Sequence, residues 1–99
     1  MISKKTSPKG KSVRLTFSLP AEVATDSVSV VGEFNDWNIA KGAMKLDAKK
    51  GVWTKGVSVT PGSSVQFRYV LDGSTWVNDD AADAYVPNEY WSENGVVEA

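Results

Sequence analysis

The chain contains no cysteine and no histidine among its 99 residues, and these absences exclude whole classes of protein. Without cysteine there is no disulfide framework, no thiol nucleophile and no thiolate metal site. Without histidine there is no imidazole general base and no histidine-ligated metal. A catalytic function would therefore rest on carboxylates, lysine, tyrosine or serine alone, and we expect neither a metal nor another cofactor.

Long apolar segments are also missing. No run approaches the roughly 20 apolar residues of a membrane span, and no apolar stretch of a secretory signal follows the first lysines. We therefore expect a cytoplasmic protein without membrane association. The net charge is only −1, but residues 1–14 contain five bases and no acid, whereas residues 72–99 contain seven acids and no base. Because there is no basic face or recognition motif, we expect no nucleic-acid partner.

The remaining composition, 41% hydrophobic and 23% charged, is typical of a globular domain. Residues 1–11 are small, polar and basic, with Pro8 and Gly10 as breakers, and predict a flexible tail. The length of the rest is that of one domain. We therefore expect a single domain over residues 12–99.

Alternation of apolar and polar residues predicts strands rather than helices. The segments with a β-rich pattern are 13–19, 28–32, 52–59, 65–71 and 96–97. Helix evidence is confined to residues 79–85, which are too few to form a layer. About six strands, with turn signals roughly every ten residues, predict an all-β fold: an antiparallel, immunoglobulin-like β-sandwich.

The unusual feature is the presence of four tryptophans. Trp53 precedes a β-rich run, and we expect it in the core. Trp37 lies in a loop rich in Asn and Asp, Trp76 follows a turn at Asp72-Gly73, and Trp91 lies in a polar, acidic stretch. Four core aromatics of this size are too many for one small domain, so at least part of this set should face outward.

Two of these tryptophans belong to longer motifs. Val30-Val-Gly-Glu-Phe-Asn-Asp-Trp-Asn38 is followed about thirty residues later by Gln66-Phe-Arg-Tyr-Val-Leu-Asp-Gly-Ser-Thr-Trp76. Together they resemble the family 48 carbohydrate-binding modules, which include the glycogen-binding domain of the AMP-activated protein kinase β subunit and the N-terminal domains of isoamylases and branching enzymes. The resemblance covers about residues 12–99. It implies an early-set β-sandwich that binds α-1,4-linked glucan of the glycogen or starch type without catalysis.

The resemblance also implies a set of sugar-binding residues. Trp37 and Trp76 would form the platform for the sugar, and Arg68, where the kinase domains have lysine, would hydrogen-bond sugar hydroxyls. The remaining wall would come from the C-terminal loop, through Tyr90, Ser92 and Asn94. A shift of one residue in this loop would replace Tyr90 by Trp91. The chemistry fits, because indole removes the apolar C–H faces of glucose from water and guanidinium and amide groups match its hydroxyls.

The register of the hairpin at Asp72-Gly73 decides on which face Trp76 lies. A two-residue loop would place Trp76 opposite Tyr69, facing inward. A three-residue loop from Leu71 to Gly73 would pair Trp76 with Arg68 on the outward face. We predict the second, because the resemblance puts Arg68 and Trp76 in one site.

The polar residues also allow other roles. A glycosidase needs two carboxyl groups roughly 5–9 Å apart across a cleft. The candidate acids share one local segment, miss the spacing of a calcium loop and are expected to be solvated: Asp79, Asp80 and Asp83. We expect Asn35 and Asp36 to cap the backbone of their own loop.

An early-set domain can instead serve protein–protein interaction or assembly without binding sugar. Retention of both platform tryptophans together with Arg68 favours the sugar. Beyond the glucan itself, a glycogen-metabolising enzyme and a second copy of the chain are both open as partners.

Overall fold

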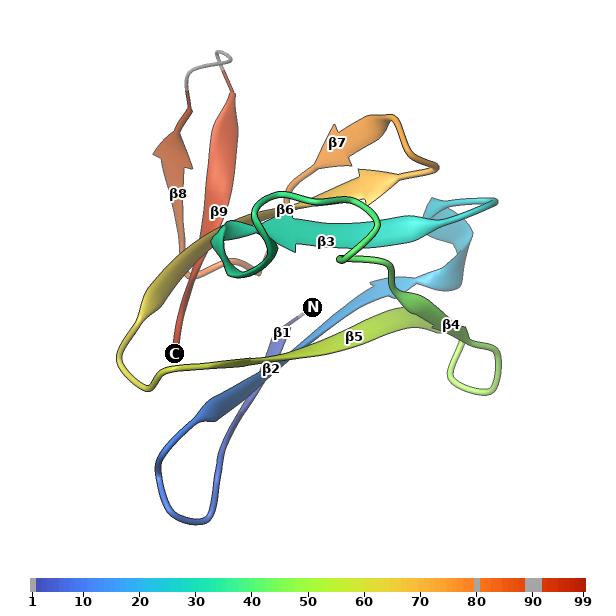
Figure 1. The fold of residues 1–99 in the computed structure, drawn as a ribbon. Helices are drawn as coiled ribbons and strands as arrows, with labels where there is room; N and C mark the ends of the chain where they lie inside the picture. The colour runs from blue at the N-terminus through green and yellow to red at the C-terminus, as the bar shows by residue number, and fades with distance from the viewer. Residues whose placement is uncertain (1, 80, 89–91) are drawn as a thin grey trace.

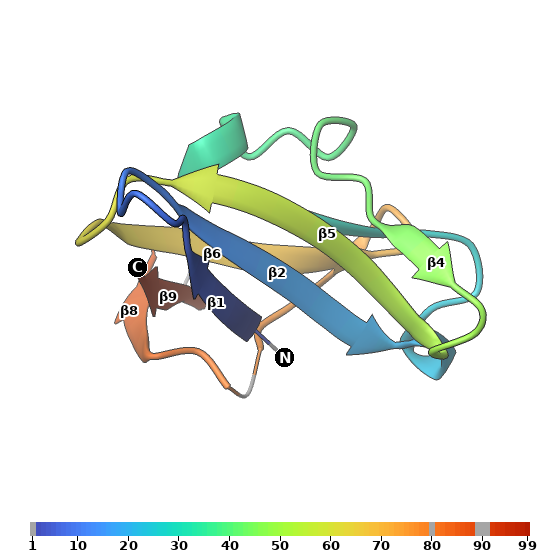
Figure 2. The same cartoon turned by 90° about the horizontal axis from the view of Figure 1, so that it is seen from below.

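The computed structural model describes residues 2–79, 81–88 and 92–99. Two antiparallel sheets pack face to face, which confirms the predicted all-β sandwich (Figures 1 and 2). The first sheet has the order β1 (Ile2–Thr6), β2 (Val13–Pro20), β5 (Val52–Val59) and β4 (Lys45–Asp47). The second has the order β3 (Val28–Gly32), β6 (Ser64–Leu71), β9 (Glu93–Glu98) and β8 (Ala84–Pro87), and β7 (Thr75–Val77) also pairs with β6.

The helical content of the described residues is limited to two short 3₁₀ turns, η1 (Ala21–Val23) and η2 (Glu33–Asn35). Neither has the length and apolar character that crossing a bilayer requires. The segment 79–85, whose sequence has the helix evidence, contains a turn and the start of β8 in its described part. The strongly alternating segments therefore all form strands, and the short edge strands are additions to them.

The first half of the predicted flexible tail forms a strand, and its second half forms the turn that leads into β2. Ile2–Thr6 pairs along the whole first half of β2, with Ile2 opposite Phe17, so this segment belongs to the sandwich. The free backbone groups at the edge of β2 offer hydrogen bonds to any extended neighbour, and Ile2 packs against the core. A polar segment with a single apolar residue gives no alternation, which is why its sequence did not predict a strand.

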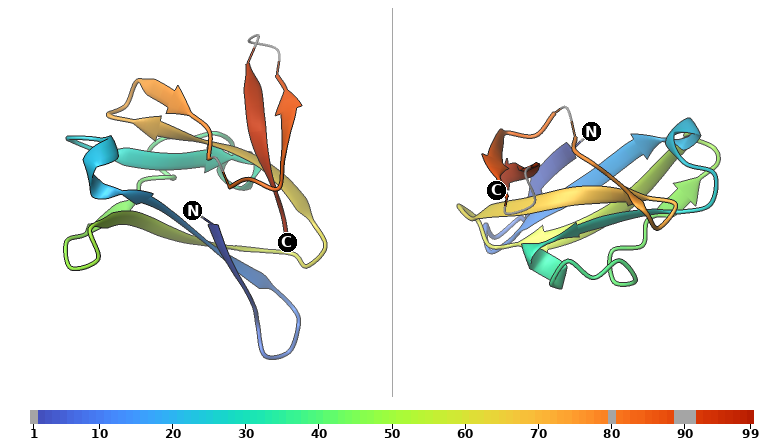
Figure 3. Two further views of the ribbon diagram at one scale, coloured as in Figure 1. Left: turned by 180° about the vertical axis from the view of Figure 1, so that it is seen from behind. Right: turned by 90° about the horizontal axis from the view of Figure 1, so that it is seen from above.

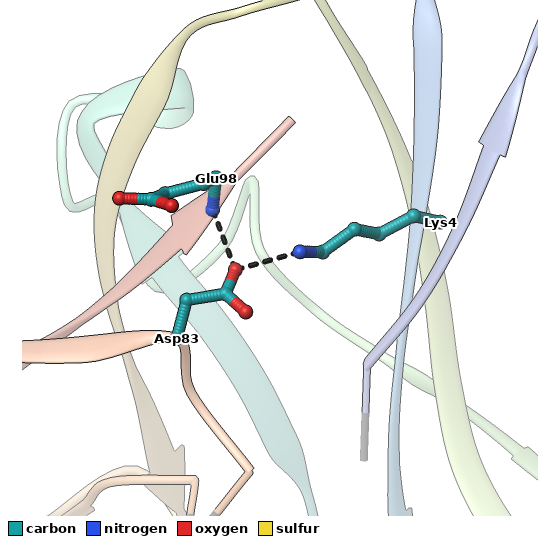
Figure 4. Close-up of polar contacts among 3 residues, drawn as sticks. All are labelled: Lys4, Asp83 and Glu98. Carbon is teal, nitrogen blue, oxygen red and sulfur yellow. Dashed lines mark hydrogen bonds and ion pairs between the residues drawn. The ribbon is translucent and has the colours of Figure 1, made fainter.

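A polar cluster ties this strand to the second sheet (Figure 4). Lys4 Nζ lies 2.7 Å from Asp83 Oδ2 in an ion pair. The same oxygen accepts a hydrogen bond from the backbone N–H of Glu98 at 2.8 Å. The Glu98 amide and then Lys4 hold the pKa of Asp83 below its ordinary value, and burial opposes this lowering only weakly. The cluster therefore joins β1 to the segment before β8 and to β9.

The core lies between the sheets and centres on Phe17. Its ring lies 5.1 Å from that of Phe67, 5.8 Å from Phe34 and 6.3 Å from Tyr69, measured between centroids. Trp53 is 8% exposed and donates from its indole N–H to the carbonyl oxygen of Ala21, which confirms the predicted core position.

Strand β6 organises the second sheet. Its residues alternate, so that Phe67 and Tyr69 enter the core while Gln66 and Arg68 lie on the outward face. The first half of β6 pairs with β9 and the second half with β7. Figures 1 and 3 show that the β8–β9 hairpin and β7 both project away from the first sheet. The outward face of β6 therefore lies between these two projections.

Candidate functional site

An open groove with a volume of about 830 Å³ runs over the outward face of β6. Five of the predicted site residues line it: Trp37, Arg68, Trp76, Ser92 and Asn94. Three further lining residues were not predicted: Glu33, Gln66 and Asn88. Tyr90 and its alternative Trp91 lie outside the described residues. The groove thus brings together side chains from η2 and the loop after it, from β6 and β7, and from the β8–β9 hairpin.

The position of Trp76 depends on the hairpin between β6 and β7. Trp76 pairs with Val70, so the predicted pairing with Arg68 is wrong by two residues. The loop consists of residues 72–74, because Leu71 pairs with Thr75. The predicted face is nevertheless correct, since residues two apart on a strand share one face. Trp76 is 42% exposed and faces outward beside Arg68.

The turn of this hairpin is anchored by Asp72. Asp72 and Gly73 both have positive φ, of 52° and 75°, as the central residues of a tight hairpin turn require. The Asp72 carboxylate accepts hydrogen bonds from the backbone N–H groups of Asp26 at 2.7 Å and Ser27 at 3.1 Å. These bonds hold the pKa of Asp72 below its ordinary value. The loop before β3 therefore fixes the turn from which Trp76 extends.

The loop that presents Trp37 is held by Asn35. Its side chain accepts a hydrogen bond from the backbone N–H of Gly32 and donates one to the carbonyl oxygen of Val30, both at 3.0 Å. The predicted capping role of Asn35 is confirmed. Asp36 contributes through its backbone instead: it ends η2 in the left-handed conformation, at φ 55°. Trp37 follows at φ 59°, and its backbone N–H donates to the carbonyl oxygen of Gly32.

Arg68 is oriented by Trp76. Its Nη2 donates to the backbone carbonyl oxygen of Trp76 at 3.3 Å, and its guanidinium carbon lies 6.0 Å from the centroid of the Trp76 ring. This distance is within the range of a cation–π contact. The buried Nε of Arg68 has no hydrogen-bond partner among the described residues. Of the five N–H groups of the guanidinium, one is engaged by Trp76 and the one at Nε is buried, so the other three can donate to a ligand.

A chain of amide side chains lines the groove beside β9. Asn94 donates to the side-chain oxygen of Gln66 at 3.0 Å, and Asn88 donates to the side-chain oxygen of Asn94 at 3.1 Å. Asn88 also closes its own loop, because its side-chain oxygen accepts from the backbone N–H of Ser92 and its backbone N–H donates to the carbonyl oxygen of Ser92. The hydrogen-bonding groups of this wall are thus arranged before any ligand arrives.

Glu33 stands where β3 meets β6. Its Oε1 accepts the backbone N–H of Gln66 at 2.7 Å. The two strands approach closely here, since a Cβ on Gly32 would lie 2.3 Å from the carbonyl oxygen of Gln66. Glu33 and Gln66 belong to the two motifs, but no signal in the sequence marked this contact, because the two residues meet only in the folded sheet. The carboxylate forms part of the groove lining.

The comparison with protein families decides the identity of this sandwich. The family described as carbohydrate-binding module 48 (isoamylase N-terminal domain) matches residues 5–86. The chain belongs to this family. As a family 48 module it has the early-set, immunoglobulin-like sandwich that its sequence predicted, and membership suggests binding of α-glucan.

One curated relative of the module is an enzyme. The 1,4-alpha-glucan-branching enzyme, chloroplastic/amyloplastic, of Oryza sativa subsp. japonica is 37% identical to the module over 62 residues. The match covers 56% of the module and 7% of the enzyme. The module thus spans only a small part of that relative.

Two of the three acids considered for catalysis or calcium, Asp79 and Asp83, have structural partners in this module. Asp79 is 3% exposed, and its carboxylate accepts the Tyr69 hydroxyl at 2.6 Å and the backbone N–H of Ala81 at 2.8 Å. Burial raises the pKa of Asp79, but these hydrogen bonds help to bring it below its ordinary value. Asp83 pairs with Lys4, and Asp80 lies outside the described residues. Within the described ranges, no three potential ligand side chains gather around a metal position.

Proposed function

We propose that the module binds α-1,4-linked glucan of the glycogen or starch type without catalysing a reaction on it. Trp37 and Trp76 provide the stacking surface, and Arg68 donates hydrogen bonds to sugar hydroxyls. The observation that supports this proposal most is that both indoles and the guanidinium, from three separate segments, line one groove of a family 48 module.

The two indoles suit the apolar faces of glucose rings. Stacking removes C–H surface from water at about 25 cal/mol per Å² of apolar area, while the hydroxyl rim stays free. The 42% exposure of Trp76 leaves ring surface for such contact. Trp37 adopts a left-handed conformation, which costs a residue with a side chain about 1–2 kcal/mol. A large aromatic side chain kept at such a position supports a functional role.

The polar side chains of the groove suit the hydroxyls. Arg68 only donates hydrogen bonds, whereas the amides of Asn94 and Gln66 both donate and accept, as a hydroxyl does. Ser92 adds to this set, and Tyr90, or Trp91 in its place, remains the predicted further wall. Because successive glucose units add contacts of the same kind, we expect the affinity to increase with the length of the glucan.

The rice relative suggests that the module works together with an enzyme. Its name describes an enzyme that branches 1,4-α-glucan, and the module matches a small part of it. A binding module raises the local concentration of polymer at a linked or associated active site. We propose that the module acts with a glucan-metabolising enzyme in this way.

Affinity electrophoresis in gels that contain glycogen or amylopectin tests the binding. The wild-type module should be retarded, and Trp37→Ala and Trp76→Ala should each remove most of the retardation. Leu46→Ala is the matched control, because it removes an exposed apolar side chain that does not line the groove. If the wild-type module migrates freely in every α-glucan, binding is refuted and protein–protein contact becomes the better account. Release of reducing sugar would refute the absence of catalysis.

A further inference from the structure

We infer that the groove selects neutral α-glucan and rejects phosphorylated α-glucan, with Glu33 as the residue that determines this specificity. The inference rests on the proposed function, because it concerns the chemical class of glucan that enters the same groove. It is drawn from the position of Glu33 and from the distribution of charge over the two sheets.

The Glu33 carboxylate is fixed rather than free to turn away. Its Oε1 accepts the Gln66 N–H at 2.7 Å, and Gln66 belongs to the strand that forms the floor of the groove. Its second oxygen has no partner among the described residues. A carboxylate only accepts hydrogen bonds, so it pairs well with a sugar hydroxyl. A phosphate dianion has no proton to offer to it.

The lining of the groove provides no excess of positive charge. Arg68 is its only cation among the described lining residues, and Glu33 balances it. Arg68 is also partly engaged, since its Nη2 donates to the Trp76 carbonyl oxygen. A phosphate ester has a charge of about −1.5 to −2 at pH 7. It would therefore meet one cation and one fixed carboxylate, with no net attraction from the lining.

The strands of the two sheets differ in charge. The strands of the second sheet contain Arg68 as their only base, together with Glu93 and Glu98. Asp36, next to Trp37, adds an exposed carboxylate, and Lys41 in the same loop adds an exposed cation. The basic residues in strands otherwise lie in the first sheet: Lys4, Lys5, Arg14, Lys45 and Lys55. Because charges of one sign around a cleft repel ligands of the same sign, this distribution disfavours anionic polymers and leaves neutral ones unaffected.

Calorimetric titration with β-cyclodextrin and with phosphorylated β-cyclodextrin tests the inference, since both present the same α-1,4-linked ring. At low salt the wild-type module should bind the neutral ring at least about fivefold more tightly. Glu33→Gln retains an acceptor for the Gln66 N–H but removes the charge, so it should reduce this ratio about threefold while the melting temperature stays unchanged. Glu22→Gln, in η1, removes an exposed charge that does not line the groove, and should preserve the ratio.

Salt supplies a test that needs no variant. Raising the ionic strength from about 0.02 M to about 0.5 M shortens the Debye length and should bring the wild-type ratio toward one. Equal binding of both rings at low salt, tighter binding of the phosphorylated ring, or an unchanged ratio in Glu33→Gln would each overturn the inference while glucan binding stands. Failure of the wild-type module to bind either ring would instead overturn the proposed function.

Discussion

The guanidinium of Arg68 lies over the indole of Trp76, 6.0 Å from the ring centroid, and donates a hydrogen bond to the backbone carbonyl oxygen of the same residue. The cation and the aromatic surface are therefore one unit, presented on the outward face of the hairpin between β6 and β7. Removal of either side chain should therefore change how the other one binds a ligand.

The first prediction concerns this pair. Arg68→Ala should weaken binding of maltoheptaose about tenfold or more, because hydrogen bonds to charged groups contribute about 1.5–3 kcal/mol. Arg68→Lys retains the charge but loses the planar set of donors, so its affinity should be intermediate. Isothermal titration calorimetry measures both. Equal affinities of the wild type and Arg68→Ala, with the fold intact, would contradict a role for the guanidinium in binding.

The second prediction concerns pH and the anchor of the same hairpin. The backbone N–H groups of Asp26, Ser27 and Thr25 hold the pKa of Asp72 below its ordinary value of 3.8. A lowered pKa stabilises the fold at every pH above the unfolded value, and this contribution is lost as the pH falls through the lower, folded value. Asp72→Asn should therefore melt at a lower temperature than the wild type at pH 7. The difference should narrow below about pH 4.

Thermal unfolding followed by circular dichroism at a series of pH values measures this difference. Asp47→Asn is the control, because among the described residues the Asp47 carboxylate bonds only within its own turn, to the N–H of Lys50. A gap between Asp72→Asn and the wild type that stays constant down to pH 2 would argue against the carboxylate as the anchor.

The third prediction concerns the loop of Trp37. Asn35→Ala leaves the carbonyl oxygen of Val30 and the backbone N–H of Gly32, both in buried residues, without these partners, which costs about 1–3 kcal/mol. It should also weaken glucan binding, since the loop presents Trp37. Asn38→Ala removes one exposed hydrogen bond, to the N–H of Lys41, and should cost less. Urea denaturation gives both free energies of unfolding, and equal values for the two variants would contradict the account of the loop.

The fourth prediction concerns the buried pair behind the groove. Burial, and then the Asp79 carboxylate, raise the pKa of Tyr69 far above its ordinary value, so its hydroxyl remains a donor. Tyr69→Phe leaves that carboxylate without this donor and should destabilise the fold by about 1–3 kcal/mol. Tyr85→Phe removes a hydrogen bond to the backbone carbonyl oxygen of Asp79 instead, and should cost less because the Tyr85 side chain is 41% exposed. Urea denaturation gives the free energy of unfolding of each variant. A Tyr69→Phe variant as stable as the wild type would refute a stabilising role for the hydrogen bond between Tyr69 and Asp79.

The sequence predicted the central strands because they alternate over a long enough segment. In β2, Val13, Leu15 and Phe17 are buried while the residues between them are not. The edge strands β1, β4 and β8 have mostly exposed residues in runs of three to five, so no alternation distinguishes them from loops. Their pairing is set by the free edges of β2, β5 and β9, which exist only in the folded sheets.

The groove was predictable in part for a related reason. Trp37, Arg68 and Trp76 belong to local motifs that the chain displays directly. Glu33 and Gln66 are 33 residues apart, and their hydrogen bond forms only when β3 and β6 pair. The hairpin register was also missed, since the face of Trp76 follows from its motif but its partner depends on the loop of residues 72–74. Contacts between distant segments therefore could not be predicted from the sequence.

Indole N–H signals in a ¹H–¹⁵N correlation spectrum, assigned by single Trp→Phe variants, test the central claim most directly. On titration with maltoheptaose, the signals of Trp37 and Trp76 should shift in a saturable way. The signal of Trp53 should stay in place, because its N–H donates to the carbonyl oxygen of Ala21 inside the sandwich. Unchanged Trp37 and Trp76 signals at saturating maltoheptaose would contradict the proposal that these two tryptophans bind α-glucan.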